Sequence, residues 1–203
     1  NTTARFAELT PKLLGATIVA GILFGLAGKL FAELTHGVQQ LFKKLVPYAP
    51  LRPALGAVLV IGLTFALGTR DFLGIGVASP DPHGVSILSA FTPGGASPVM
   101  GGVILRFTAV TLASGFKGGE VTPLFFIGST AGLAFAHLFH LPAGAFAAFG
   151  FVAVVAAAAN TPIAAAVMGM EILPGPVGVY AALCAGTAYL LVGHRSVYAS
   201  QKL

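Results

Sequence analysis

The sequence predicts an all-α membrane protein whose helices are broken by glycine and proline. Hydrophobic residues make up 56% of the 203 residues and charged residues only 8%, whereas soluble domains carry about 25% charged residues. The mean hydropathy is +0.91, and no Asp, Glu, Lys or Arg occurs between Glu120 and Glu171. Because a membrane-spanning helix needs about 20 apolar residues, the chain has room for about six to eight membrane segments.

Charge and cysteine usage narrow the possible partners and cofactors. The net charge is +5, but the basic residues are dispersed, so we expect a lipid bilayer and no nucleic acid as the partner. We expect no cofactor and no metal, because His137 and His140, three residues apart, have no carboxylate or cysteine nearby. The single Cys184 is expected to lie buried in a helix, since one cysteine cannot form an internal disulfide.

The first predicted helix spans residues 9–45. Thr10 is a suitable N-cap, and Pro11 fits the first helical position because its missing N–H costs nothing there. Gly21 and Gly25 form a GxxxG pair, with Gly28 about one turn further on. Small residues at this spacing let two helices approach closely.

The rest of the chain alternates apolar segments with breaks. In the first part we expect a span over 51–69, a loop over 70–84, a half-helix over 85–91, a break over 92–98 and a span over 98–116. Helices over 124–138 and 142–159 follow, and then a Pro-initiated helix within 160–176 that Pro174 and Pro176 stop. A span over 177–192 and a polar end complete the chain. Helices interrupted by Gly and Pro indicate a transporter site, because irregular backbone at membrane depth is tolerated only where it is buried or lines a cavity.

The stretch "GFKGGEVTP" interrupts two apolar segments. Gly118 and Gly119 allow backbone conformations closed to other residues, and Pro123 fits the first turn of the helix that follows. A helix start exposes unpaired N–H groups and a partial positive charge, so it favours a bound anion. The alternative is a loop followed by a capped helix without a ligand.

The expected anion donors are the backbone N–H groups of Glu120 and Val121 and the hydroxyl of Thr122. A carboxylate on Glu120 would compete with a bound anion. We therefore expect Glu120 to point away and to pair with Lys117 or water, with a proton-carrying role as the alternative. Thr122 has a second interpretation as a simple helix cap.

Three ordered motifs carry a resemblance to a known family. "SGFKGGEVTPLFFIGSTAG" resembles the stretch that begins a late half-helix in the CLC family of chloride channels and anion/proton antiporters. "AAANTPIAAAVMGMEIL" is similar to the Pro-initiated helix that follows, ending in an acidic residue, here Glu171. "HRSVYASQKL" resembles the last family helix, which carries a tyrosine, here Tyr198. The motifs span residues 106–203, whereas residues 1–98 agree only in their helix pattern.

The resemblance implies a CLC-type inverted-repeat fold, and it implies that residues 1–203 are the second half-repeat only. It implies a homodimer in a bacterial plasma membrane that transports anions, and a missing N-terminal half-repeat that carries the gating glutamate. Position by position, it implies an anion site formed by Gly119, Glu120, Val121, Thr122 and Tyr198. Tyr198 has an alternative interpretation as an aromatic residue at the membrane interface. Glu171 is expected to be structural and bonded to neighbouring backbone.

Position 121 separates branches of that family. Chloride-type members usually have Phe where this chain has Val121, and "GGEVTP" resembles the branch of fluoride/proton antiporters. Fluoride is small and strongly hydrated, so an added hydroxyl at Thr122 would replace its water better than an apolar ring. The sequence therefore predicts a fluoride/proton antiporter, with a chloride channel or chloride/proton antiporter as the alternative. A structural membrane subunit is a more distant alternative, and no HExxH or GxSxG motif supports a membrane-embedded enzyme.

Overall fold

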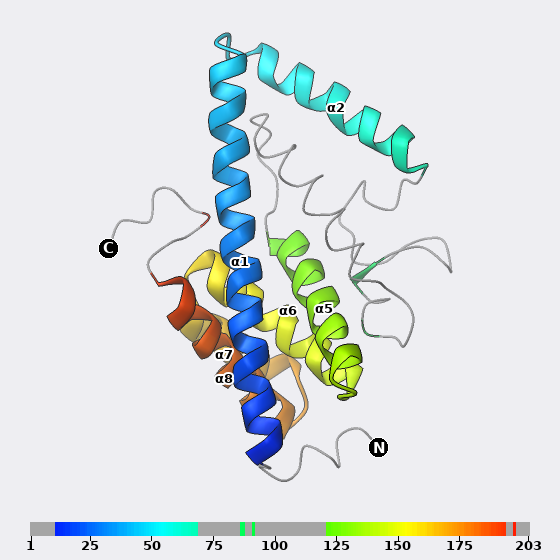
Figure 1. The fold of residues 1–203 in the computed structure, drawn as a ribbon. Helices are drawn as coiled ribbons and strands as arrows, with labels where there is room; N and C mark the ends of the chain where they lie inside the picture. Colours follow the sequence, from blue (N-terminus) through cyan, green and yellow to red (C-terminus); the bar gives the residue numbers. More distant parts are fainter. Residues whose placement is uncertain (1–10, 69–85, 88–90, 92–120, 194–196, 198–203) are drawn as a thin grey trace.

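The computed structural model describes residues 11–68, 86–87, 91, 121–193 and 197, and the elements that it describes are α-helices (Figure 1). They are α1 (Pro11–Leu45), α2 (Leu51–Leu67), α5 (Val121–Leu138), α6 (Ala143–Ala159), α7 (Pro162–Ile172) and α8 (Pro176–Val192). The all-α prediction is confirmed for these residues. The expected loop over 70–84, the break over 92–98 and the span over 98–116 lie outside them, as does most of the expected half-helix over 85–91.

Helix boundaries follow from proline and from left-handed residues. α1 begins at Pro11, and α7 and α8 begin at Pro162 and Pro176, where φ is already suitable for a helix and no N–H is lost. α2 ends two residues before the predicted Thr69, because Gly68 adopts φ 65° and donates its N–H to the Thr64 carbonyl.

The turn between α1 and α2 is held by a side chain. The Arg52 Nε donates to the Val46 carbonyl at 2.8 Å, and its guanidinium also donates to the Pro47 carbonyl at 3.2 Å. These bonds satisfy carbonyls at and beyond the C-terminal end of α1. α2 therefore leaves α1 in a fixed direction, although it packs extensively against no other described helix (Figure 1).

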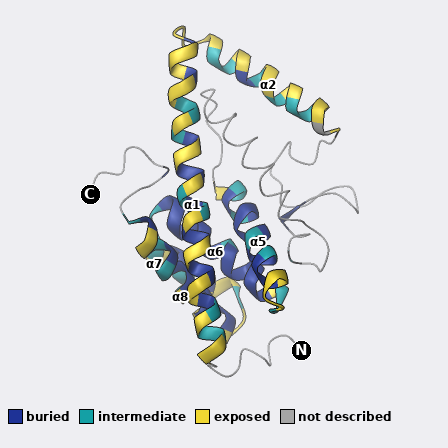
Figure 2. Cartoon of the chain, viewed as in Figure 1, coloured by how far each residue is buried: buried dark blue, intermediate teal, exposed yellow. Residues whose placement is uncertain are grey.

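Helix α6 is the centre of the packed region. It is buried on every side, and α5, α8, α1 and α7 all pack against it (Figure 2). Its aromatic residues Phe146 and Phe149 are fully buried, and the Phe149 ring lies 6.1 Å from that of Tyr180 on α8. A helix that is apolar all round is stable only when neighbours cover it completely.

Glycines allow the helices to approach each other at backbone distance. A Cβ atom on Gly128 of α5 would collide with the carbonyl group of Gly150 of α6, and one on Gly132 would collide with that of Phe146. On α1, Gly21 and Gly25 pack against α8, and Gly28 packs against α6. The predicted role of the α1 glycines in close helix packing is confirmed.

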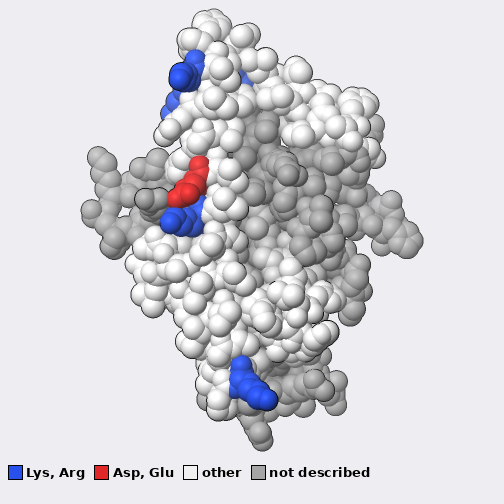
Figure 3. Space-filling model, viewed as in Figure 1, with Lys and Arg blue, Asp and Glu red and all other residues white. Residues whose placement is uncertain are grey.

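The exposed surface of the described helices is largely apolar and carries few charged side chains. In Figure 3, Lys and Arg side chains mark the two ends of α1, and one acidic group lies beside a basic one midway along the visible face. Among the described helices, α1 and α5 are long and apolar enough to cross a membrane, and the remaining four are apolar but shorter. Cys184 is fully buried in α8, as predicted.

Candidate anion site at the start of α5

Helix α5 begins at Val121, directly after the Gly-Gly-Glu sequence. The helix thus starts three residues before the predicted residue 124, and Pro123 is its third residue. Thr122 is the second residue and lies inside the first turn rather than at the N-cap. In a helix that starts at Val121, the N–H groups of Val121 and Thr122 have no carbonyl four residues earlier within the helix to accept them, so they are candidate donors to a ligand. Val121 is 39% exposed and Thr122 is half-buried.

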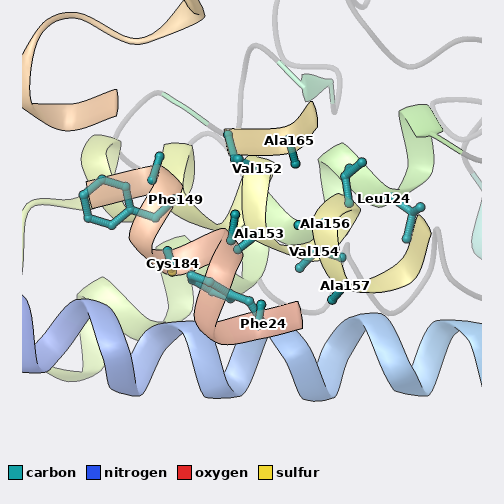
Figure 4. Packing of buried hydrophobic residues seen from close by; sticks show 14 of the residues in the cluster. Phe24, Leu124, Phe149, Val152, Ala153, Val154, Ala156, Ala157, Ala165 and Cys184 are labelled. Atoms are coloured by element: carbon teal, nitrogen blue, oxygen red, sulfur yellow. The ribbon is translucent and has the colours of Figure 1, made fainter. Parts of the chain in front are cut away.

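The start of α5 lies beside the end of α6. Gly128 faces Gly150, and Gly132 faces Phe146, so the two helices run antiparallel with these residues in register. Extending that register by two turns places Val121 and Thr122 beside the last turn of α6. Figure 4 shows Leu124, Ala156 and Ala157 at the same end of the buried cluster.

The C-terminal segment returns to the same place. The Val197 N–H donates to the Ala158 carbonyl at 2.9 Å, and Val197 is buried. Tyr198 follows directly in the sequence. It lies outside the described residues, as do Gly119, Glu120 and Lys117. The structure therefore brings together Val121, Thr122 and the residue before Tyr198, at one end of α6.

Asn160 is a polar residue at this end that the sequence analysis missed. It adopts φ 58° and ends α6, and its N–H donates to the Ala156 carbonyl. Its side-chain Oδ1 is buried and has no hydrogen-bond partner among the described residues. α7 starts two residues later, so its N-terminal end lies at the same level as that of α5. An Asn before Thr-Pro in an apolar sequence is a sign of such a helix stop and restart.

The chemistry of this end is that of dipoles. Among the described residues from Val121 to Met170 no side chain is charged, so on these helices an anion at Val121 and Thr122 meets N–H groups, a hydroxyl and the α5 dipole. Because an anion held in this way is not locked in a strong ion pair, it can leave again. Such a site suits passage of an ion more than permanent binding.

Other predicted residues lie elsewhere. His137 and His140 are both exposed at the opposite end of α5. Among the described residues, no group of three or more His, Cys, Asp or Glu side chains is placed to hold a metal ion. Glu171, which we expected to bond to neighbouring backbone, is exposed near the end of α7.

Comparison with known proteins identifies the family. The model of the voltage gated chloride channel family matches residues 2–193. A chloride/fluoride channel protein of Pseudomonas syringae pv. tomato is 44% identical over 193 residues, which are 93% of this chain and 41% of that protein. The crystal structure of a CLC-type fluoride/proton antiporter superposes with a TM-score of 0.86 at 30% identity, over 97% of this chain and 48% of that one.

The chain spans less than half the length of each of these two relatives. The family match nevertheless covers nearly the whole of this chain, and the likeness of fold extends over the same residues. Together with its apolar helices, this match identifies the chain as a membrane protein. The chain belongs to the voltage-gated chloride channel family, the CLC family that its sequence resembles.

Proposed function

We propose that this chain is the C-terminal half-repeat of an anion transporter, and that the whole protein is a fluoride/proton antiporter rather than an enzyme. One observation carries the proposal. Helix α5 starts at Val121 beside the end of α6, and no residue from Val121 to Met170 is charged. Such a helix start attracts an anion without binding it irreversibly.

Each predicted site residue has a role in this proposal. Thr122 donates its hydroxyl, and the backbone N–H groups of Val121 and Glu120 donate from the helix start. Gly119 lets the backbone approach the ion closely. Tyr198 donates its phenolic hydroxyl, and the hydrogen bond between Val197 and Ala158 supports its proximity, because it anchors the preceding residue at the end of α6.

Two findings favour fluoride. The solved relative is described as a fluoride/proton antiporter, and the Pseudomonas relative as a chloride/fluoride channel protein. Val121 is 39% exposed at the first position of α5. A side chain smaller than Phe leaves room there for a small ion that keeps part of its hydration, and the Thr122 hydroxyl replaces another part.

A chloride channel or chloride/proton antiporter is the second candidate. The description of the Pseudomonas relative as a chloride/fluoride channel supports it. In either case we propose a homodimer in a bacterial plasma membrane, in which an N-terminal half-repeat completes the ion path and carries the proton-coupling glutamate. Unsatisfied helix ends in lipid are costly, so the half-repeat is expected to need that partner.

The test is ion efflux from liposomes that contain the full-length protein, loaded with equal fluoride and chloride, with external pH recorded in parallel. The proposal predicts that fluoride leaves while protons move the other way, and that chloride is retained. Efflux of both ions without proton movement would instead support the channel. If neither fluoride nor chloride leaves the liposomes, anion transport itself is contradicted.

A further inference from the structure

The side chain of Thr35 on α1 is an exception among the helical threonines. Thr17, Thr64, Thr130 and Thr187 each donate their hydroxyl to the carbonyl four residues earlier, at 2.8–3.0 Å. The same acceptor, the Phe31 carbonyl, is available to Thr35 in a regular helix. The Thr35 hydroxyl nevertheless has no hydrogen-bond partner among the described residues, although the residue is only 1% exposed. A buried hydroxyl without a partner is costly and therefore needs an explanation.

The relative directions of the helices show which way the start of α5 points. α1 and α8 run parallel, because the Thr17 carbonyl lies against Cys184 and Gly25 lies against Ala188. α6 shares that direction, since Phe149 lies against Tyr180, and Val152 and Ala181 both lie against Gly169. α5 runs the opposite way. The N–H groups at its start therefore open toward the C-terminal direction of α1.

Thr35 lies further along α1 in that direction. Gly28 packs against Ala157 and Ala158, which are level with the start of α5. Seven residues make nearly two full turns, so Thr35 lies on the same face of α1 as Gly28 and about 10 Å further along it. It is therefore past the end of α6, on the face of α1 that Gly28 also occupies.

We infer that the Thr35 hydroxyl is a second contact for the transported anion, on the side toward which the N–H groups at the start of α5 point. This inference rests on the proposed function. A buried hydroxyl that makes no hydrogen bond to its own helix can donate to an ion or to the water that accompanies it. A partner of this kind also explains why the residue is polar at a buried position. Thr35 then selects and guides the ion before it reaches Val121 and Thr122.

The test uses efflux of fluoride and chloride from liposomes that contain the full-length protein. Thr35→Val keeps the shape and removes the hydroxyl, Thr35→Ser keeps the hydroxyl, and Thr17→Val is the matched control on the same helix. Thr17 is equally buried, but its hydroxyl donates to the Leu13 carbonyl. We expect Thr35→Val to slow efflux of the transported anion about two- to tenfold, the value of one hydrogen bond. Thr35→Ser and Thr17→Val should stay near the wild-type rate.

Thermal unfolding of the same variants separates transport from structure. The melting temperature of Thr35→Val should equal or exceed that of the wild type, because no protein hydrogen bond is lost. Wild-type efflux from Thr35→Val, or a fall in melting temperature that accompanies its loss of flux, would overturn the inference. If the wild-type protein moves neither anion, the proposed function fails, and this inference fails with it. If the wild type transports and Thr35→Val transports at the wild-type rate, the inference alone is wrong.

Discussion

Helices α2 and α6 are both 17 residues long and almost wholly apolar, yet their surroundings differ completely. Fourteen residues of α6 are buried, and four other helices cover it. α2 presents Val58, Ile61 and Phe65 to the surroundings, with Phe65 83% exposed. Hydropathy thus marks both segments as membrane helices but does not say which one other helices cover. α6 is covered in part through glycine contacts, which α5 and α1 place against it.

The largest expected effect on the free energy of unfolding is that of a substitution in α6. Phe149→Ala removes a fully buried ring that lies 5.0 Å from Phe146 and 6.1 Å from Tyr180. We expect a loss of about 3–5 kcal/mol in the free energy of unfolding, because the neighbouring helices close the resulting cavity only partly. Unfolding of the purified full-length protein in detergent measures it. If the variant and the wild type have the same free energy of unfolding, α6 is not the centre of the fold.

The contact between α5 and α6 is expected to be nearly as sensitive. Gly128→Ala places a methyl group on the Gly150 carbonyl, which is backbone and cannot rotate away. The helices must separate, at a cost of about 1–3 kcal/mol. Gly62→Ala on α2 is the matched control, because nothing lies within 4 Å of the added atom. It should leave the melting temperature unchanged or raise it, and equal destabilisation by both substitutions would contradict the proposed contact.

The end of α6 should respond to backbone conformation. Asn160 has φ 58°, where a side chain other than Asn or Gly is strained. Asn160→Ala should therefore cost about 1 kcal/mol, whereas Asn160→Gly should be neutral. Comparing the melting temperatures of the two variants tests this. Equal loss in both would mean that the amide group itself stabilises the junction between α6 and α7.

The smallest expected effect on the free energy of unfolding is that of a substitution on α2. Phe65→Ala on α2 removes the same ring as Phe149→Ala, but from a position that is 83% exposed. The free energy of unfolding of the chain should change by no more than about 0.5 kcal/mol. The same unfolding assay measures it. A loss as large as that of Phe149→Ala would show that another part of the protein covers α2.

Much of the helix pattern could be predicted from local sequence. Pro11 and Pro162 begin helices for a reason contained within one residue, the fixed φ of proline, whereas Pro176, which we expected to stop a helix, begins α8. The contact of Gly128 with Gly150 could not be predicted, because it depends on which helix packs against which. The unusual state of Thr35 could not be predicted either, because only the structure shows that its buried hydroxyl makes no hydrogen bond to its own helix.

The site was predicted in part for the same reason. The start of α5 near Val121 follows from the Gly-Gly pair and Pro123, which lie close together in the sequence. Asn160 was missed because its place beside α5 depends on the antiparallel register of α5 and α6. The position of Val197 at the end of α6 depends on a hydrogen bond between residues 39 positions apart in the sequence, Val197 and Ala158. Local patterns find helix starts, but tertiary packing decides which of them meet.

The most direct test of the anion site is a calorimetric titration of fluoride into the full-length protein and its Thr122→Val variant. Thr130→Val is the control, because its hydroxyl donates to the Phe126 carbonyl within α5 and is not available to a ligand. We predict that Thr122→Val weakens fluoride binding about two- to tenfold, as expected for one lost hydrogen bond, while Thr130→Val keeps the wild-type affinity. Equal affinity in the wild type and Thr122→Val would contradict an anion site at the start of α5.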